Sequence, residues 1–430
     1  MNIQTPEEVC QPDIEMAARL FETLRVQGFD GVGITRDAYG AGENAAHALM
    51  KAEAEKLGLE TMSDFAGNLH MTLAGKDRTA PRILIGSHLD SVAQGGNYDG
   101  AAGVVGGLAV VAGLIRGGFV PPVDITVIAV RAEESGSWFP AGYPGSKATL
   151  GTLPVELLEA QRKDTQRTLA EHMTDCGCDV EAIRTGQRLF GPDNVAAYLE
   201  LHIEQGPVLD SEGISVGVVT GIPSSRRLRA GRVIGEYNHS GATPRKYRAD
   251  AAIALAELAV KLDEYWGDLD ATGRQVVCTF CVLETTADAS FTKIAGEARF
   301  QLDVRSIDPG TVQAVFDRLH QLVPEIEARR HVRFELGGEG ANDGVPMHPL
   351  IRRDLIDAAN AAGVRCIEMP SGGGHDPVAF ALAGVPAGLL FVSNQHGSHN
   401  PHEAMRLEDF DAACRVMVAW VMQSAGKTYN

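Results

Sequence analysis

An uninterrupted apolar run, VDITVIAV at Val123–Val130, restricts the fold of this chain more than any other feature. A continuous apolar strand is buried on both faces, as in a parallel sheet that helices cover on either side. The neighbouring segment Ala101–Ile115 is a helix of small residues, which can pack closely on such a sheet. We therefore predict an α/β domain with a central, mostly parallel sheet covered by helices.

Strand and helix patterns alternate in the first and last thirds of the 430 residues, but the middle differs. Residues 215–334 read as a β-α-β-β-α-β series, which is typical of a ferredoxin-like α+β module. A chain of this length also exceeds what one hydrophobic core usually holds. We predict a catalytic domain of residues 1–214 and 335–430, interrupted by an inserted domain of residues 215–334.

The chain is acidic, with 38 Lys and Arg against 56 Asp and Glu, a net charge of −18. Such a charge repels nucleic acid phosphates and favours cations as partners. The N-terminus lacks the basic and apolar regions of a secretory signal. The longest apolar run, Ala101–Ile115, is shorter than the roughly 20 residues of a membrane helix. We expect a cytoplasmic protein that binds neither nucleic acid nor membranes.

Side chains that can bind metals follow four predicted strands, at the edge where open α/β sheets form their sites. Three histidines and two carboxylates there suit Zn²⁺, Mn²⁺ or Co²⁺. Five ligands are too many for one open catalytic zinc ion, but they suit a pair of ions that shares a bridging carboxylate. A lone histidine after a strand is usually an ordinary loop residue, whereas four strand ends together predict a site. The three histidines are His88, His202 and His399, and the carboxylates from which the two ligands would come are Asp90, Asp99, Glu133 and Glu134.

Glu133 and Glu134 directly follow the buried strand Val123–Val130. One carboxylate of such a pair can bind metal while the other acts as a general base and acid. A solvated acidic turn is the alternative, and the buried strand in front of the pair argues against it.

Seven motifs follow one another along the chain: the HLD and Asp of His88–Asp99, Glu133-Glu134, HIEQGPVL at His202–Leu209, NHSGATP at Asn238–Pro244, LDVRS at Leu302–Ser306, SGGGHD at Ser371–Asp376 and GSHNPHE at Gly397–Glu403. In this order they resemble the motifs of the hydantoinase/carbamoylase family. This family is the amidase branch of the aminoacylase-type dinuclear metallohydrolases, and it includes N-carbamoyl-L-amino acid hydrolases, β-ureidopropionases and allantoate amidohydrolases.

The resemblance implies two divalent metal ions, Zn, Mn or Co. His88, Asp99 and His202 would hold one ion, and Asp99, Glu134 and His399 the other, with Asp99 bridging. Glu133 would be the general base that activates a metal-bridging water. Asp90 would orient a ligand imidazole, and His239 would stabilise the oxyanion of the tetrahedral intermediate.

The resemblance also implies how a substrate that carries a carboxylate is held. Gln205 and Arg305 would contact the substrate, and His375 and Gly373 of the glycine-rich motif would line its site. The inserted domain would act as a lid and as the surface of a homodimer, and some of its residues could act across that dimer.

Two departures from the family pattern concern the substrate. Thr292 stands where relatives have an Asn that helps to hold the substrate carboxylate, and a hydroxyl is shorter and offers one donor instead of two. The loop after the acidic pair carries Trp138-Phe139 where relatives usually have Arg-Phe.

Three functions remain open from the residues. The first is hydrolysis of the ureido C–N bond of an N-carbamoyl-L-amino acid. The second is hydrolysis of allantoate, another linear ureide or an N-acyl amino acid in a rebuilt pocket. The third, a binding protein without activity, is disfavoured because every position of the implied site is chemically competent.

Overall fold

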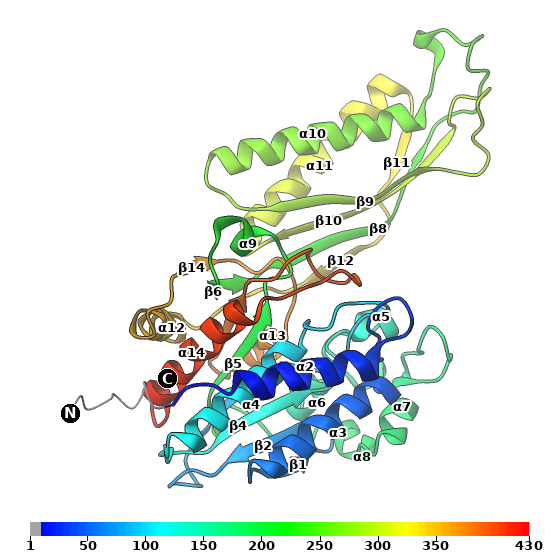
Figure 1. Cartoon of the computed structure of the whole chain (residues 1–430). Coiled ribbons are helices and arrows are strands. Elements are labelled where there is room, and N and C mark those ends of the chain that lie inside the picture. The colour runs from blue at the N-terminus through cyan, green and yellow to red at the C-terminus, as the bar shows by residue number, and fades with distance from the viewer. Residues whose placement is uncertain (1–9, 430) are drawn as a thin grey trace. The chain divides into compact units, whose positions relative to one another are not determined.

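The computed structural model describes residues 10–429 (Figure 1). The chain forms two compact units, one ending at Thr220 and resuming at Met347, the other spanning Gly221–Pro346. Residues 1–9, on which the expectation about a secretory signal partly rests, lie outside the described part. None of the helices within residues 10–429 combines the length and the apolar character that a bilayer crossing requires.

An eight-stranded sheet forms the centre of the first unit, in the order β1-β2-β4-β3-β5-β15-β6-β14. Strands β4, β3, β5 and β15 run parallel to one another, and β14 is parallel to β6. The antiparallel pairs are β1–β2, β2–β4 and β15–β6. This is the mostly parallel sheet that the sequence predicts. The strands are β1 (Glu60–Ser63), β2 (Leu69–Leu73), β3 (Arg82–His88), β4 (Ile125–Val130), β5 (Val195–Ile203), β6 (Val216–Val219), β14 (Cys366–Met369) and β15 (Ala387–Val392).

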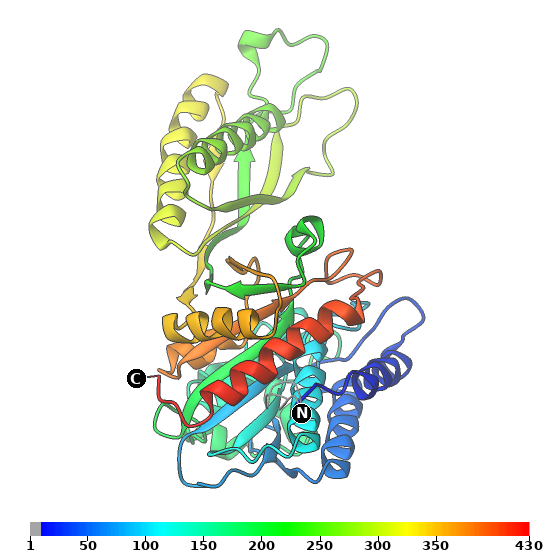
Figure 2. The same ribbon diagram turned by 60° about the vertical axis from the view of Figure 1, so that its left-hand side comes forward.

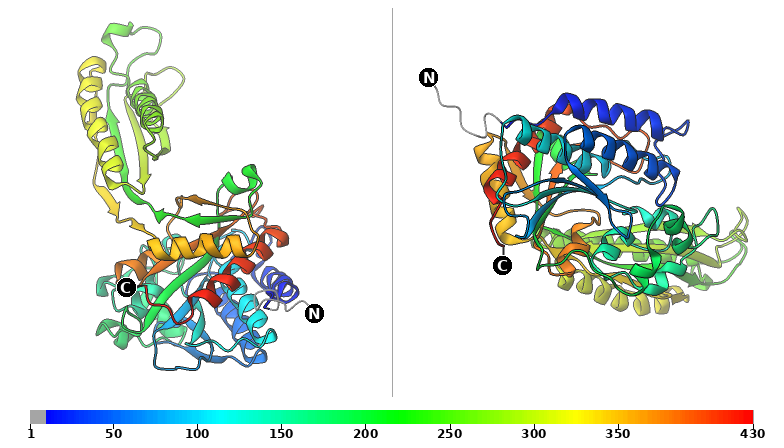
Figure 3. Two further views of the ribbon diagram at one scale, coloured as in Figure 1. Left: turned by 90° about the vertical axis from the view of Figure 1, so that its left-hand side faces the viewer. Right: turned by 90° about the horizontal axis from the view of Figure 1, so that it is seen from below.

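Helices of the first unit pack on one another as well as on the sheet. Helices α2 and α3 contact each other, as the view from below in Figure 3 shows, and α12 lies beside α14 in Figure 2. The helices are α2 (Ile14–Gly28), α3 (Ala41–Lys56), α4 (Ala101–Arg116), α5 (Ser135–Trp138), α6 (Pro144–Thr149), α7 (Leu169–Asp175), α8 (Val180–Arg184), α9 (Val208–Glu212), α12 (Pro349–Ala361), α13 (Pro377–Leu382) and α14 (Leu407–Ser424), with a 3-10 turn at Val155–Glu159.

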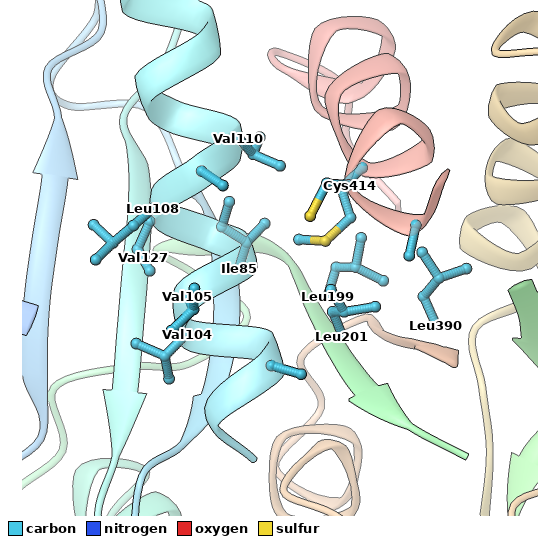
Figure 4. Close-up of a cluster of buried hydrophobic side chains, with 14 of the residues drawn as sticks. Ile85, Val104, Val105, Leu108, Val110, Val127, Leu199, Leu201, Leu390 and Cys414 are labelled. Carbon is cyan, nitrogen blue, oxygen red and sulfur yellow. The ribbon is translucent and has the colours of Figure 1, made fainter. Parts of the chain in front are cut away.

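The sheet buries both faces, as its continuous apolar strands require. On one face Ile85 packs beneath helix α4, and Leu199 and Leu390 lie toward helix α14, which carries Cys414 (Figure 4). The residue next to Ile85, Leu84, belongs to a separate core on the opposite face. In that core the rings of Tyr198 and Phe380 stack with centroids 4.1 Å apart. Successive residues of a strand therefore pack against the helices on opposite faces of the sheet.

Helix α4 approaches the sheet closely because of its small residues. A Cβ atom on Gly103 would overlap the backbone carbonyl of Leu201. Only glycine fits this contact, so the small-residue pattern of the sequence reflects the distance between helix and sheet.

The second unit has an antiparallel sheet in the order β11-β8-β10-β9, with β12 also paired to β8. Helices α10 and α11 contact each other and this sheet, and one core of buried residues joins the three elements. The chain order is β-α-β-β-α-β. The elements are β7 (Gly221–Ile222), β8 (Ser224–Ile234), α10 (Ala251–Ala271), β9 (Val277–Thr285), β10 (Glu297–Ser306), α11 (Pro309–Arg330), β11 (Arg333–Glu335), β12 (Glu339–Asn342) and β13 (Val345–Pro346), with a 3-10 turn at Arg245–Tyr247.

The unit boundaries differ from the domain limits expected at residues 215 and 334. Strand β6 pairs with β15 and β14, so residues 216–219 belong to the first unit. Strand β12 pairs with β8, and β13 pairs with β7, so residues up to Pro346 belong to the second. Both boundaries follow from the pairing of backbone strands, which local amino-acid composition does not predict.

Candidate active site

The predicted metal ligands gather at one edge of the first unit's sheet. Strands β3, β4, β5 and β15 are parallel, so their carboxyl ends lie at the same edge. Strands β3 and β5 themselves contain His88 and His202, and the segments after β4 and β15 carry Glu134 and His399. The loop in front of helix α4 adds Asp99.

Asp99 lies at the centre of this cluster, and its two oxygens face different partners. Its Oδ1 atom lies 3.4 Å from Nε2 of His88 and 3.2 Å from Nε2 of His202. Its Oδ2 atom lies 3.5 Å from Nε2 of His399, which is 2.6 Å from Oε1 of Glu134. Two groups able to hold a metal ion therefore share one carboxylate.

The donor atoms of the first group fit a cation. Oδ1 of Asp99 is buried and has no hydrogen-bond partner among the described residues. The Nδ1 atom of His202 lies 2.8 Å from the carbonyl oxygen of Ile203, and Nδ1 of His88 lies 3.1 Å from the carbonyl oxygen of Asp90. Since a carbonyl only accepts, both Nδ1 atoms carry the proton, and both Nε2 atoms offer a lone pair to the centre.

Gly100 makes room for this arrangement. Its φ angle is +65°, and a Cβ atom there would overlap the imidazole of His88. The position accepts neither the backbone conformation nor the volume of an ordinary L-residue.

Asp90 connects two strand ends. Its Oδ1 atom accepts the backbone N–H of Glu133 at 3.0 Å and lies 3.2 Å from Nδ1 of His88. Its Oδ2 atom accepts the backbone N–H of Glu134 at 3.0 Å. One buried carboxylate thus orients a ligand imidazole and fixes both members of the acidic pair.

The Glu133 carboxylate lies beside the first group, with Oε2 3.9 Å from Nε2 of His88. Burial raises the pKa of Glu133 well above its usual range, and the carboxylate of Glu134 raises it further, while His88 opposes both. A carboxyl group with a raised pKa binds a proton more readily than an ordinary carboxylate, a property that suits acid–base catalysis.

Gln205, Gly373 and His375, expected to contact the substrate, come together in the first unit. Gln205 has a φ angle of +64° and donates from Nε2 to Oδ2 of Asp99 at 2.8 Å. A Cβ atom on Gly373 would lie 2.9 Å from Oε1 of Gln205 and 3.7 Å from Nε2 of His375. In this structure the side chain of Gln205 therefore contacts the carboxylate that the two groups share.

His375 is part of a third group that the sequence reading missed. Together with Glu200 and His202 it could hold a metal ion, and all three residues are buried. Its ring lies 4.4 Å from that of His202, and burial and this neighbour hold the pKa of His375 well below its usual range. Glu200 lies mid-strand in β5, and the spacing of two from His202 was the available signal.

His239 and Thr292 lie side by side in the second unit. The backbone N–H of Ser240 donates to the carbonyl of Thr292 at 2.9 Å. Nδ1 of His239 accepts the backbone N–H groups of Gly241 and Ala242, at 3.1 and 3.0 Å. Because Nδ1 is an acceptor, the neutral ring carries its proton on Nε2, where it can be donated.

Arg305 lies on strand β10, where its guanidinium pairs with Asp303 at 2.8 Å. Ser225 at the start of β8 is its register partner, whereas Glu297 pairs with Ile234 at the other end of that strand. His239 follows beyond Ile234 and is bridged to Lys293. The eight residue steps from Glu297 to Arg305 span roughly 26 Å at strand spacing. His239 and Arg305 therefore lie at opposite ends of the second unit's sheet.

A parallel-sheet unit in which two histidine and carboxylate groups share one aspartate, next to the buried carboxyl group of Glu133, has the kind of site that is found in metal-dependent hydrolases. The chain belongs to peptidase family M20/M25/M40, whose model matches residues 84–423. Within this family of metallohydrolases it is one of the hydantoinase/carbamoylase amidases, which are hydrolases of C–N bonds.

Individual relatives agree with this family. The chain is 34% identical over 410 residues to the N-carbamoyl-L-amino acid amidohydrolase of Geobacillus stearothermophilus, covering 95% of this chain and 97% of the relative. It is 30% identical over 395 residues to the allantoate amidohydrolase of Bacillus subtilis, covering 90% and 91%. A hydantoinase/carbamoylase family amidase from Burkholderia ambifaria superposes with a TM-score of 0.85 at 29% identity, covering 98% of each chain.

Proposed function

We propose that the protein hydrolyses the ureido C–N bond of an N-carbamoyl-L-amino acid with two divalent metal ions. The observation that carries this proposal is Asp99, whose two oxygens each face a separate ligand group. The identity with an N-carbamoyl-L-amino acid amidohydrolase over nearly the whole chain supports the substrate class.

When bound, two such ions lower the pKa of a water molecule and polarise the carbonyl group of the substrate. Glu133 takes the proton from the attacking water and delivers it to the leaving nitrogen. His239 donates from Nε2 to the developing oxyanion. Arg305 holds the substrate carboxylate through its planar guanidinium. Thr292 lies beside His239, so it reaches the substrate from the same chain as His239, with one hydroxyl donor in place of an amide.

The distance between His239 and Arg305 bears on the expected homodimer. One small substrate cannot touch both residues of the same unit when roughly 26 Å of strand separates their ends. We therefore propose that Arg305 serves the site of its own chain and His239 that of a partner chain. Dimerisation and lid function of the second unit, and the cytoplasmic location, stay predictions.

Mixing two inactive variants tests this division. In a dimer of E133Q with H239A, one site has an intact Glu133 and receives an intact His239 from the other chain. Statistical exchange makes half of the dimers mixed, each with one working site, so about a quarter of the wild-type activity should return. If both residues act within one chain, no activity returns on mixing.

Ammonium release by protein loaded with Mn²⁺, Co²⁺ or Zn²⁺ tests the substrate. The panel contains N-carbamoyl-L- and D-amino acids, N-carbamoyl-β-alanine, allantoate, and N-acetyl and N-formyl amino acids. We expect ammonium and a free amino acid from the N-carbamoyl-L-amino acids. Turnover confined to allantoate or to an acylated substrate would contradict the proposed N-carbamoyl-L-amino acid substrate, but it would still agree with hydrolysis of a C–N bond.

Allantoate remains the second candidate because of two observations. A 30% identical relative is named allantoate amidohydrolase. Trp138, in the loop behind the acidic pair, is held by a hydrogen bond from Nε1 to the carbonyl of Ser91 at 2.9 Å and by Arg162 stacked 4.6 Å from its ring. A fixed indole near the site would shape the pocket for a substrate other than the one that Arg-Phe relatives accept.

A further inference from the structure

Glu403 is a buried carboxylate in the irregular segment between β15 and α14, with only 7% of its surface exposed. Its Oε1 atom accepts the backbone N–H groups of Tyr98, at 2.8 Å, and Asp99, at 3.2 Å. Its Oε2 atom lies 2.6 Å from the hydroxyl of Ser398. One side chain therefore joins the loop that carries Asp99 to the segment that carries His399.

Ser398 extends this connection to the side chain of Asp99. Its hydroxyl lies 2.6 Å from Oδ2 of Asp99, as close as it lies to Glu403. Glu403 thus holds Asp99 directly at the backbone, and it also contacts Ser398, whose single hydroxyl hydrogen can be donated to the carboxylate of Asp99.

The surrounding chain is shaped to receive Glu403. A Cβ atom on Gly96 would overlap the Glu403 carboxylate, although the backbone there has no conformation that favours glycine. On the other side, Gln395 and Ala404 exchange backbone hydrogen bonds of 2.7 and 3.1 Å, which closes the segment around Ser398 and His399. The fit is steric on one side and hydrogen-bonded on the other.

A shared carboxylate is useful only while each oxygen keeps its own direction. Free rotation about the Cβ–Cγ bond of Asp99 would remove Oδ1 from His88 and His202, or Oδ2 from His399. Ser398 contacts Oδ2 and not Oδ1, as Gln205 does, and the backbone bond from Asp99 to Glu403 fixes the Cα position from which the side chain projects. Outer contacts of this kind orient ligands and determine metal affinity.

We propose that Glu403 is a positioning residue that keeps Asp99 shared between the two ligand groups, so that the group completed by Glu134 and His399 retains its metal ion only while Glu403 is in place. This inference rests on the proposed two-metal function. Glu403 acts through Asp99 and Ser398.

The test compares E403A with E403Q by equilibrium dialysis against Mn²⁺. Alanine removes the acceptor for two backbone N–H groups and the partner of Ser398, so the second Mn²⁺ should bind roughly 10–100-fold more weakly. Glutamine can accept both N–H groups through its oxygen and donate to Ser398, which still donates to Asp99. E403Q should therefore bind two ions per chain with wild-type affinity.

Electron paramagnetic resonance gives a readout that does not depend on turnover. Two Mn²⁺ ions that share a carboxylate are magnetically coupled, whereas an isolated Mn²⁺ ion shows a six-line spectrum. We expect the coupled spectrum for wild type and E403Q, and the six-line spectrum for E403A at the same metal concentration.

G96A reaches the same contact from the other loop and should weaken the second Mn²⁺ as E403A does. E408A, which removes an exposed carboxylate five residues further on, is the matched control and should leave binding unchanged. Thermal unfolding of the metal-free proteins shows whether each variant is folded. If E403A does not fold, Mn²⁺ binding by G96A tests the proposal in its place.

Two outcomes separate this inference from the function on which it rests. Two coupled Mn²⁺ ions at wild-type affinity in folded E403A would overturn the positioning role and leave the two-metal function intact. A wild-type protein that binds a single Mn²⁺ ion per chain would overturn the two-metal function itself.

Discussion

The carboxylate of Asp90 accepts the backbone N–H of Glu133 at 3.0 Å, so a residue two positions beyond the end of β3 fixes a residue beyond the end of β4. The same oxygen lies 3.2 Å from Nδ1 of His88. The acidic pair is therefore held by its backbone, and the side chain of Glu133 remains available for chemistry.

Because its backbone bond survives, E133Q should keep the loop and the metal content of the wild type. The amide cannot take a proton, so kcat should fall by about 10²–10⁴. E134Q is the matched control, since the neighbouring change alters a ligand and should reduce bound metal in elemental analysis. Near wild-type kcat in metal-loaded E133Q would exclude Glu133 as the base.

G100A should disturb the first ligand group because the added Cβ atom overlaps the ring of His88. We expect weaker metal binding and a lower free energy of unfolding, both measured against G118A. Gly118 also has a positive φ angle, of +70°, but no described atom lies within 4 Å of its Cβ position. G118A should therefore show only the strain of about 1–2 kcal/mol and normal metal content. Equal metal affinity in the two variants would contradict the close fit around His88.

D376N should change how stability depends on pH. Burial, with the charge of Glu200, raises the pKa of Asp376 to about 8. Between the usual pKa of about 4 and this value, the folded protein holds a proton that the unfolded chain releases, so stability from this group is lost as pH rises toward 8. Asparagine stays neutral and removes the effect.

Urea unfolding of the metal-free proteins at pH 5 and pH 7.5 measures this difference. The free energy of unfolding of D376N relative to wild type should rise with pH by up to about 1.4 kcal/mol per unit. Parallel pH profiles of the two proteins would show that Asp376 is ionised in the folded state.

H239A should lower kcat by roughly 10²–10³ without changing the bound metal, as expected for the loss of one oxyanion donor. H320A, which alters an exposed histidine of the same unit, is the control. In ¹⁵N-labelled protein, the Nε2 atom of His239 should carry the proton at neutral pH, since Nδ1 accepts two backbone N–H groups. A protonated Nδ1 would contradict the tautomer and with it the proposed donor.

Several elements were readable from the sequence because one local pattern decides each of them. Ala101–Ile115 lies in helix α4, and the apolar run Val123–Val130 contains strand β4, since buried strands are continuous apolar runs. The cluster of His88, His202 and His399 followed from parallel strands that end at one edge.

Other features depend on contacts between distant segments. The region that contains helices α5 to α8 has short elements with weak periodicity, and it was not predicted. Glu200 points into the site from the middle of a strand, where a carboxylate gives no local signal. The hydrogen bond from Gln205 to Asp99 joins residues 106 positions apart, and that from Asp99 to Glu403 joins residues 304 positions apart. Only the tertiary fold brings such distant residues together, so no local pattern predicts these contacts.

The place of β15 between β5 and β6 has a consequence for the order in which the protein can be built. A ribosome releases β5 and β6, then the whole second unit, before the strand that lies between them exists. During this interval both strands expose unpaired edges, which are prone to wrong pairing and aggregation. His399 emerges later still, so a nascent chain can bring His399 to Asp99 only after the second unit and β15 have been made.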